Sequence, residues 1–324
     1  MCTAIHVAGR IPLFGRTLDV ACAYGEEVVV TPGGLPLGFS CGVRRETHLS
    51  IVGMAHVFEG KALYYDAVNE RGLAMAALRF QGNAVYHAAR KGRRGVASFE
   101  LIPYVLSACR TVEQAVALLS DVDITDESVS EALPTTPLHW MIGDAKRAVV
   151  VESVGDGVKI YENTCGVLTN NPPFPVQCLQ LSRFLQLTPD VPQNTLCPVL
   201  TPALDSLGLG AVGLPGDFSS PSRFVRAVFA KTHTVMGDTE AANVTRFFEI
   251  MGLLAVPQGC VRDGEGRVHF TRYTSLATGG TYYFSTQDCR HVHALSLADF
   301  PASATQLYRF ALPSAESVTF LQVR

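Results

Sequence analysis

Three residues near the start of the chain, Cys2, Arg16 and Asp19, could together activate a thiol nucleophile. If Met1 is removed, Cys2 carries both a thiol and a free α-amine. An unperturbed α-amine titrates close to neutral pH, so the neutral amine can take the proton of its own thiol. A cation such as Arg16 lowers the pKa of a nearby thiol, and a carboxylate such as Asp19 can hold a protonated amine. Alone, these residues also fit an ordinary terminal cysteine and a surface ion pair.

A β-hairpin would bring these residues together. Residues 2–7 are β-branched and apolar at alternate positions, which predicts a strand. Ala8-Gly9-Arg10 is a plausible turn, and residues 11–18 form a second extended run. Pro12 indicates that this second strand lies at an edge or starts late. The hairpin places Arg16 and Asp19 alongside residues 2–5.

Several stretches carry a resemblance to a known family. The opening Met-Cys-Thr and residues 14–19 (Phe-Gly-Arg-Thr-Leu-Asp) resemble the start of the choloylglycine hydrolase family. These are N-terminal-nucleophile amidases that include bile salt hydrolases and penicillin V acylases. Further stretches follow in the family's order, at 68–73, 137–142, 166–172, 213–218 and 222–224. The resemblance covers nearly the full length and is weakest over the last fifty residues.

The resemblance implies a site around Cys2. It implies that Arg16 and Arg223 tune the charge of the thiol and the amine, and that Asp19 lies beside them. It also implies that Asn170 donates a hydrogen bond to the tetrahedral oxyanion, a contact worth about 10²–10³ in rate. Read alone, Asn170 is a common turn asparagine and Arg223 a surface arginine at the start of a predicted helix.

Arg79 departs from the family pattern. Bile salt hydrolases of the family carry asparagine here and many penicillin acylases carry tyrosine, while the backbone N–H of this residue is the second oxyanion donor. An arginine would suit a substrate that ends in carboxylate or sulfonate; alternatively, it points into solvent or pairs with Glu70. By alignment, Leu18, Tyr24 and Phe58 would line an apolar acyl pocket, although they could equally be core residues.

The implied function is hydrolysis of the amide bond in glycine- or taurine-conjugated bile acids. The first alternative is a penicillin V acylase or another N-acyl amidase that uses the same site. The second is a catalytically silent binding protein of the same fold, although such a protein has no evident need of the complete set of site residues. The resemblance implies no cofactor and, because the family is often tetrameric, a homo-oligomer.

The composition argues against a disordered, a nucleic-acid-binding and a membrane protein. Hydrophobic residues make up 48% and charged residues 17% of the 324 residues, which indicates a globular chain with a sizeable core. The net charge of −3 gives no electrostatic reason to expect nucleic acid or an anionic membrane as a partner. We find no apolar run of transmembrane length and no signal-peptide pattern.

The nine cysteines form no Cys-x-x-Cys pair and predict mostly buried, reduced thiols in a cytoplasmic protein. His291 and His293 have no evident third ligand, so we predict no metal site.

The order of elements predicts one domain over residues 1–324. Groups of strands alternate with groups of helices, which is not a βαβ pattern and favours two antiparallel-rich sheets with helices outside. The resemblance supplies the layer order, the four-layer αββα sandwich of N-terminal-nucleophile hydrolases. We predict a polar turn at 66–72, a solvated basic loop at 90–94, a loop or short helix at 121–133, and a helix capped by Asp238. The predicted strands are 27–31, 48–58, 72–80, 138–142, 148–152, 158–161, 166–169, 268–275, 281–285, 292–297 and 306–312, and the predicted helices are 99–109, 111–119, 176–187, 222–235 and 238–254.

Overall fold

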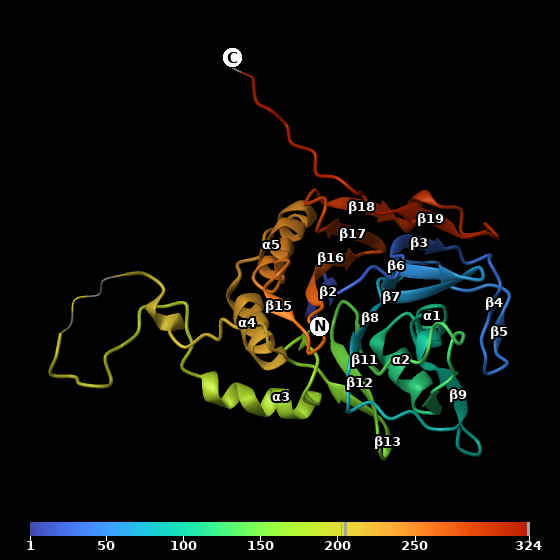
Figure 1. Ribbon diagram of the computed structural model, residues 1–324, viewed down its shortest axis with the longest axis horizontal. Coiled ribbons are helices and arrows are strands. Elements are labelled where there is room, and N and C mark those ends of the chain that lie inside the picture. The colour runs from blue at the N-terminus through green and yellow to red at the C-terminus, as the bar shows by residue number, and fades with distance from the viewer. Residues whose placement is uncertain (202, 204–205, 323–324) are drawn as a thin grey trace.

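Two large antiparallel sheets form the centre of the computed structural model, which describes residues 1–324 apart from 202, 204–205 and 323–324 (Figure 1). The first sheet has the order β14 (Val167–Leu168), β1 (Cys2–Val7), β2 (Leu13–Val20), β16 (Val268–Thr278), β17 (Thr281–Thr286) and β18 (His293–Ser296), and β15 (Val261–Arg262) pairs with β16. The second has the order β13 (Gly157–Glu162), β12 (Ala148–Val154), β11 (Leu138–Gly143), β8 (Ala74–Arg79), β7 (Lys61–Asn69), β6 (Ile51–Phe58), β3 (Glu27–Thr31) and β19 (Tyr308–Ala311).

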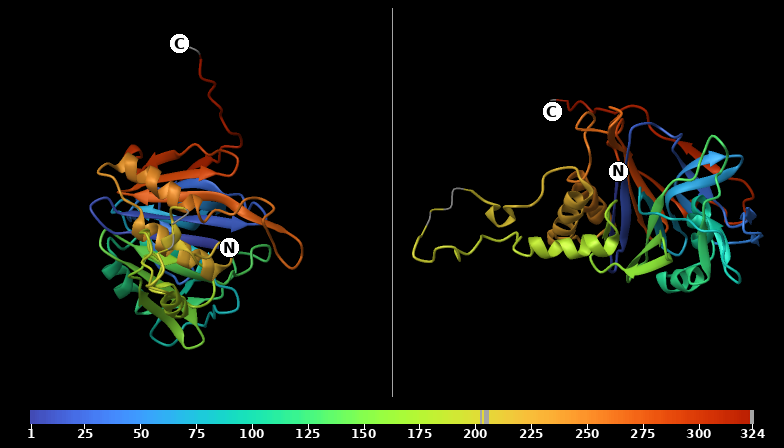
Figure 2. Two further views of the ribbon diagram at one scale, coloured as in Figure 1. Left: turned by 90° about the vertical axis from the view of Figure 1, so that its left-hand side faces the viewer. Right: turned by 60° about the horizontal axis from the view of Figure 1, so that its bottom comes forward.

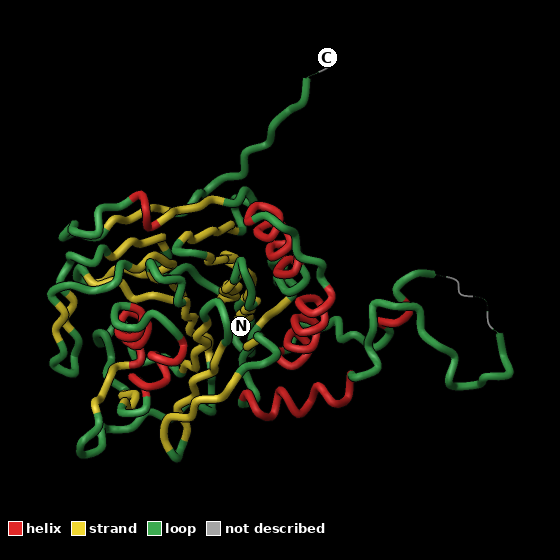
Figure 3. The backbone as a smooth tube through the Cα atoms, turned by 180° about the vertical axis from the view of Figure 1, so that it is seen from behind, coloured by secondary structure: helices red, strands yellow, loops and turns green. Residues whose placement is uncertain are grey.

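Helices cover the outer face of each sheet. On the first sheet lie α4 (Ser220–His233) and α5 (Glu240–Gly252), with α3 (Phe174–Gln180) packed against α4. On the second lie α1 (Leu101–Leu106) and α2 (Val112–Leu119), so the view from behind shows red helices on both sides of the yellow strands (Figure 3). The predicted αββα sandwich is therefore confirmed. Smaller elements are the hairpin β4 (Leu37–Gly38) and β5 (Arg44–Arg45), the parallel pair β9 (Arg94–Ala97) and β10 (Val122–Thr125), and 3-10 turns at Ser98–Glu100, Leu181–Phe184, Leu209–Ala211 and Leu297–Asp299.

Alternation along the strands of the second sheet builds two separate cores. In β3, Val28 and Val30 belong to the core between the sheets, whereas Val29 belongs to the core under α1 and α2. In β11, Met141 faces the first core and Ile142 the second. A sheet that is buried on both faces explains why its strands are apolar at nearly every position.

The N-terminal hairpin lies inside the first sheet. β1 pairs with β2 so that Ala4 is opposite Arg16, and β2 also pairs with β16. The second strand therefore starts late, after Pro12, and does not lie at an edge. Gly15 permits this packing, because an added Cβ would lie 2.0 Å from the backbone oxygen of Ser275 in β16.

Several predicted elements were wrong or incomplete. We predicted a polar turn over 66–72, but β7 continues to Asn69, and the polar residues Asp66 and Asn69 are buried in that strand. Part of 121–133 is the strand β10, and Thr239 caps α5 in place of Asp238. The prediction of mostly buried cysteines was also wrong, because only three of the nine are buried. All nine are free thiols. Arg90, in the basic loop, pairs with Asp123.

Two segments extend away from the sheets. The described residues between α3 and α4 and those after β19 both leave the body of the molecule (Figure 2). The first carries many exposed apolar side chains, among them Leu185, Leu196, Val199, Leu207 and Val212. Within the described residues, no helix is both long enough and apolar enough to cross a membrane.

Candidate active site

Cys2 is the first residue of β1 and only 3% of it is exposed. Its backbone nitrogen donates a hydrogen bond to Oδ1 of Asn170, at 2.9 Å. Met1 prolongs the pairing of β1 with β2, because its amino group donates to the backbone oxygen of Asp19 at 2.5 Å and its own backbone oxygen accepts a bond from the nitrogen of Asp19 at 2.9 Å. The nitrogen that becomes the α-amine on loss of Met1 is thus already held by Asn170.

Arg223, in α4, is fully buried and donates to the same Asn170 oxygen that accepts the bond from the Cys2 nitrogen. Its Nη2 donates to Oδ1 of Asn170 at 2.8 Å, and its Nη1 donates to the backbone oxygen of Cys2 at 2.5 Å and to Oγ1 of Thr3 at 2.6 Å. Burial lowers the pKa of Arg223, opposed by the negative charges of Asp19 and Cys2. Asn170 therefore joins the guanidinium to the backbone of the nucleophile.

Arg16, in β2, is the second buried cation. Its Nη1 donates to the backbone oxygen of Ala77 at 2.7 Å, and its Nε donates to that of Thr17 at 3.1 Å. Its Nη2 is buried and has no hydrogen-bond partner among the described residues. Burial alone would lower its pKa, but nearby acidic groups, with Cys2 foremost, raise it overall. Arg16 therefore remains a cation in the electrostatic field of the thiol.

Asp19 is fully buried but forms no ion pair within the described part of the chain. Its Oδ1 accepts a hydrogen bond from Oγ1 of Thr271 at 2.6 Å, and its Oδ2 accepts one from Oγ1 of Thr17 at 3.3 Å. Its charge acts on Arg16 and Arg223 over a longer distance. Asp19 thus balances two buried cations without contacting either.

A second buried carboxylate, Asp66, was missed from the sequence. It accepts hydrogen bonds from the hydroxyls of Tyr273 at 2.5 Å, Tyr282 at 2.7 Å and Ser275 at 2.8 Å. Burial raises the pKa of Asp66, and the charge of Arg16 opposes that shift. Asp66 lies in the strand β7, where we had predicted a polar turn, so its polarity was read as exposure.

The side-chain amide of Asn170 connects the two sheets. Its Nδ2 donates to the backbone oxygen of Arg79 at 2.8 Å. Because Oδ1 accepts from two donors, the amide orientation is set by its hydrogen bonds. An NH2 group has two hydrogens, and the second makes no hydrogen bond within the described residues. It is free to meet an oxyanion near Cys2.

The other predicted residues are less tightly gathered. Arg79 is exposed, and its Nη2 donates to Oε1 of Gln81 at 3.3 Å rather than pairing with Glu70. Burial raises the pKa of Tyr24, and the charge of Arg79 opposes this rise. Tyr24 is 48% exposed. The remaining two positions are Leu18, which is buried in the core between the sheets, and Phe58, which is half-buried at the end of β6.

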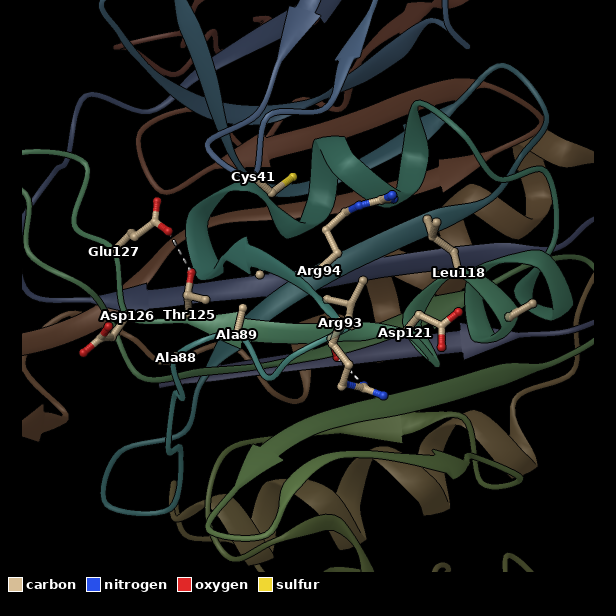
Figure 4. A pocket seen from close by; sticks show the side chains of 14 residues that line it. Cys41, Ala88, Ala89, Arg93, Arg94, Leu118, Asp121, Thr125, Asp126 and Glu127 are labelled. Atoms are coloured by element: carbon tan, nitrogen blue, oxygen red, sulfur yellow. Dashed lines mark hydrogen bonds between the residues drawn. The ribbon is translucent and has the colours of Figure 1, made fainter.

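A separate pocket of about 950 Å³ opens beside β9, β10 and α2 (Figure 4). Arg93, Arg94, Asp121 and Glu127 are among its lining residues, and Arg93 also pairs with Asp123. Of the described residues that line it, none is a predicted site residue. Within the described chain, no group of three or more His, Cys, Asp or Glu side chains could hold a metal ion.

Comparison with known proteins gives consistent matches. The model of the family "Linear amide C-N hydrolases, choloylglycine hydrolase family" matches residues 2–306. A bile salt hydrolase/transferase of Lactiplantibacillus plantarum is 37% identical over 316 residues, or 97% of this chain and 98% of that protein. The crystal structure of a mutant conjugated bile acid hydrolase from Clostridium perfringens has a TM-score of 0.92 at 26% identity and covers 99% of this chain and 100% of that one. Penicillin V acylase from Agrobacterium tumefaciens shares the fold, with a TM-score of 0.77 at 20% identity over 97% of this chain and 92% of its own.

Proposed function

The chain belongs to the choloylglycine hydrolase family of linear amide C–N hydrolases, and we propose that it cleaves the amide bond of bile acids conjugated with glycine or taurine, with Cys2 as nucleophile. The observation that carries this proposal is the clamp on the Cys2 nitrogen. Asn170 holds that nitrogen, and Arg223 holds both Asn170 and the Cys2 carbonyl. Relatives named bile salt hydrolase, at 30–37% identity, support the substrate class.

The chemistry follows from the positions of these groups. After loss of Met1, the neutral α-amine takes the proton of the Cys2 thiol, and the thiolate attacks the amide carbon. The cations Arg16 and Arg223 stabilise the negative charge of the thiolate and of the oxyanion in this buried site. Nδ2 of Asn170 and the backbone N–H of Arg79 are the proposed oxyanion donors. The amine then returns the proton to the departing glycine or taurine, and water hydrolyses the thioester.

The anionic end of the conjugate would meet Arg79. The guanidinium of Arg79 is exposed, and the backbone oxygen of Arg79 accepts the hydrogen bond from Asn170. The Arg79 side chain therefore extends from a backbone position at the edge of the reacting centre. Its only side-chain hydrogen bond within the described residues is the 3.3 Å contact with Gln81, which is easily exchanged for a carboxylate or sulfonate. With Leu18 and Phe58, Tyr24 is our candidate for the steroid side of the pocket.

A homo-oligomer, by resemblance a tetramer, is the proposed assembly. The described residues between α3 and α4 extend away from the body (Figure 1). Apolar side chains on this segment, such as Leu185 and Leu207, are exposed, as expected of an arm that packs on a second copy. We further propose one domain over residues 1–324 and a cytoplasmic location. Light scattering of the purified protein would show a mass near four times 34.9 kDa, and a monomer at micromolar concentration would refute the assembly.

The test of function is release of free glycine and taurine from conjugated bile acids, measured beside hydrolysis of penicillin V. We expect kcat/KM for at least one conjugate to exceed that for penicillin V by more than tenfold. A preference for penicillin V would replace the proposed substrate class. No turnover of any amide by protein that has lost Met1 would favour a silent binding protein instead.

A further inference from the structure

His139 and Glu152 form a buried polar pair between the sheets that the mechanism above does not use. Neither side chain is exposed at all, and Nδ1 of His139 lies 3.2 Å from Oε1 of Glu152. Nε2 of His139 lies 2.8 Å from the backbone oxygen of Thr169. Oε1 of Glu152 also accepts a hydrogen bond from the backbone nitrogen of Phe174 at 2.9 Å, while its Oε2 has no partner within the described residues.

The contacts of this pair determine where its protons lie. Because a backbone oxygen only accepts, the Nε2 of His139 must carry a hydrogen that it donates to Thr169. A neutral ring would then present a bare lone pair at Nδ1 to the carboxylate of Glu152, which is repulsive. A proton must therefore lie between Nδ1 and Oε1, and the pair carries one proton more than a neutral histidine beside a carboxylate. Separating the partners would leave an unpaired buried charge, which is strongly destabilising.

His139 contacts both backbone segments that carry the proposed oxyanion donors. Thr169, which accepts its hydrogen bond, immediately precedes Asn170. The ring of Phe80, which immediately follows Arg79, stacks on the imidazole with centroids 4.3 Å apart and planes 7° from parallel. The two segments belong to different sheets, and this imidazole packs between them on the inner face of β11.

We infer that His139, which shares a proton with Glu152, is a positioning residue that fixes the spacing between the two oxyanion donors. The inference deepens the proposed function and rests on it for the identity of those donors. The hydrogen bond to Thr169 sets the position of the strand end that carries Asn170, and the stack on Phe80 sets that of Arg79. Displacement of such a donor by about 1 Å costs on the order of 10²-fold in rate.

Two reactions of Cys2 separate this role from a general structural one. Acylation by p-nitrophenyl acetate passes through a tetrahedral oxyanion, whereas alkylation by iodoacetamide does not. Both are followed by mass spectrometry of the Cys2 peptide in the full-length protein. In His139→Phe, a ring remains to stack on Phe80 but the donor to Thr169 is lost. We expect its acylation rate to fall by at least about tenfold, below the ~10²–10³ of a deleted donor, with alkylation unchanged within about twofold.

Glu152→Gln is the second variant, because it alters no volume and tests the pair even if His139→Phe fails to fold. The new amide cannot accept from both the Phe174 nitrogen and Nδ1 of His139 without leaving an unpaired imidazolium. The same selective loss of acylation is expected. Ile142→Ala is the matched control: it opens a cavity in the same strand, on the opposite face, and should lower stability without selective loss.

Equal effects on acylation and alkylation, no effect on either, or a selective loss in Ile142→Ala would each overturn the inference. The ester assay needs no bile acid. A wild-type protein that releases no glycine or taurine but is still acylated at Cys2 would therefore contradict the proposed substrate without deciding the role of His139.

Discussion

The substitution Asn170→Asp replaces the amide NH2 group by oxygen and leaves the shape of the side chain unchanged. The bonds from the Cys2 nitrogen at 2.9 Å and Arg223 at 2.8 Å would then go to a carboxylate. The first would strengthen from about 1 to about 1.5–3 kcal/mol, whereas the bond from the guanidinium is already charge-assisted. Against that gain, the donor to the Arg79 oxygen at 2.8 Å becomes a second acceptor, at a cost of about 1–3 kcal/mol. The unfolding free energy should therefore fall by no more than about 2.5 kcal/mol or rise by no more than about 1 kcal/mol.

Activity should respond very differently. Aspartate has no N–H to offer the oxyanion, and its charge repels the one that forms, so kcat/KM should fall by at least about 10²–10³-fold. Initial rates of glycine release, with chemical unfolding in parallel, would measure both quantities. The matched control is Asn171→Asp, whose Nδ2 donates to Gln81 at 2.7 Å and does not contact Cys2; its kcat/KM should stay within about tenfold of wild type. If Asn170→Asp kept more than a tenth of wild-type kcat/KM, its amide would not be an oxyanion donor.

Four further predictions concern processing, nucleophile, substrate and pH. Active enzyme should lack the initiator methionine by intact mass, and full activity in protein that retains it would exclude the amine as base. Cys2→Ser should lose activity by orders of magnitude with its fold intact, because an alkoxide is harder to generate than a thiolate; in the wild type, alkylation should reach Cys2 before the other eight cysteines, and inactivation that tracks a different thiol would contradict the site. Arg79→Ala should lower kcat/KM for conjugates by about 1.5–3 kcal/mol and lower it much less for a neutral amide analogue, so equal losses would place Arg79 outside the anion site. Hydrogen bonds from Ser219 and Ser222 lower the pKa of Asp217 to about 2, so this carboxylate stabilises the start of α4 above pH ~4 and that contribution is lost as the pH falls towards 2. Asp217→Asn should therefore be less stable than wild type at neutral pH and approach it in stability only when the pH falls below 2, and an undiminished difference at pH ~1 would contradict the assignment.

The N-terminal hairpin could be predicted because both determinants are local. Alternating apolar residues defined β1, and Pro12 correctly delayed the start of β2. The order of the four layers could not be derived in this way. Periodicity shows that a strand is buried on both faces but not which sheet covers it, so the layers came from the resemblance alone.

The polar groups on the inner faces of the sheets were beyond the reach of sequence reasoning. Asp66 and His139 lie within strands, and their hydrogen-bond partners are 207–216 and 13–30 residues away along the chain. A polar residue in an apolar run indicates either a turn or a buried network, and only the partner distinguishes them. For His139 the available signal was its place in an otherwise apolar run at 138–142, where a histidine without a satisfied partner would be costly.

The two buried arginines bear directly on the state of the amine. Once Met1 is lost, the Cys2 nitrogen has two N–H groups and one lone pair, and Oδ1 of Asn170 at 2.9 Å takes one of the hydrogens. Arg16 and Arg223 are fully buried cations in the field of this site. Like charges nearby disfavour an ammonium ion at this nitrogen. The amine is therefore held in its basic form until it takes the proton of the thiol. The only group that then needs that proton is the departing amine of the substrate.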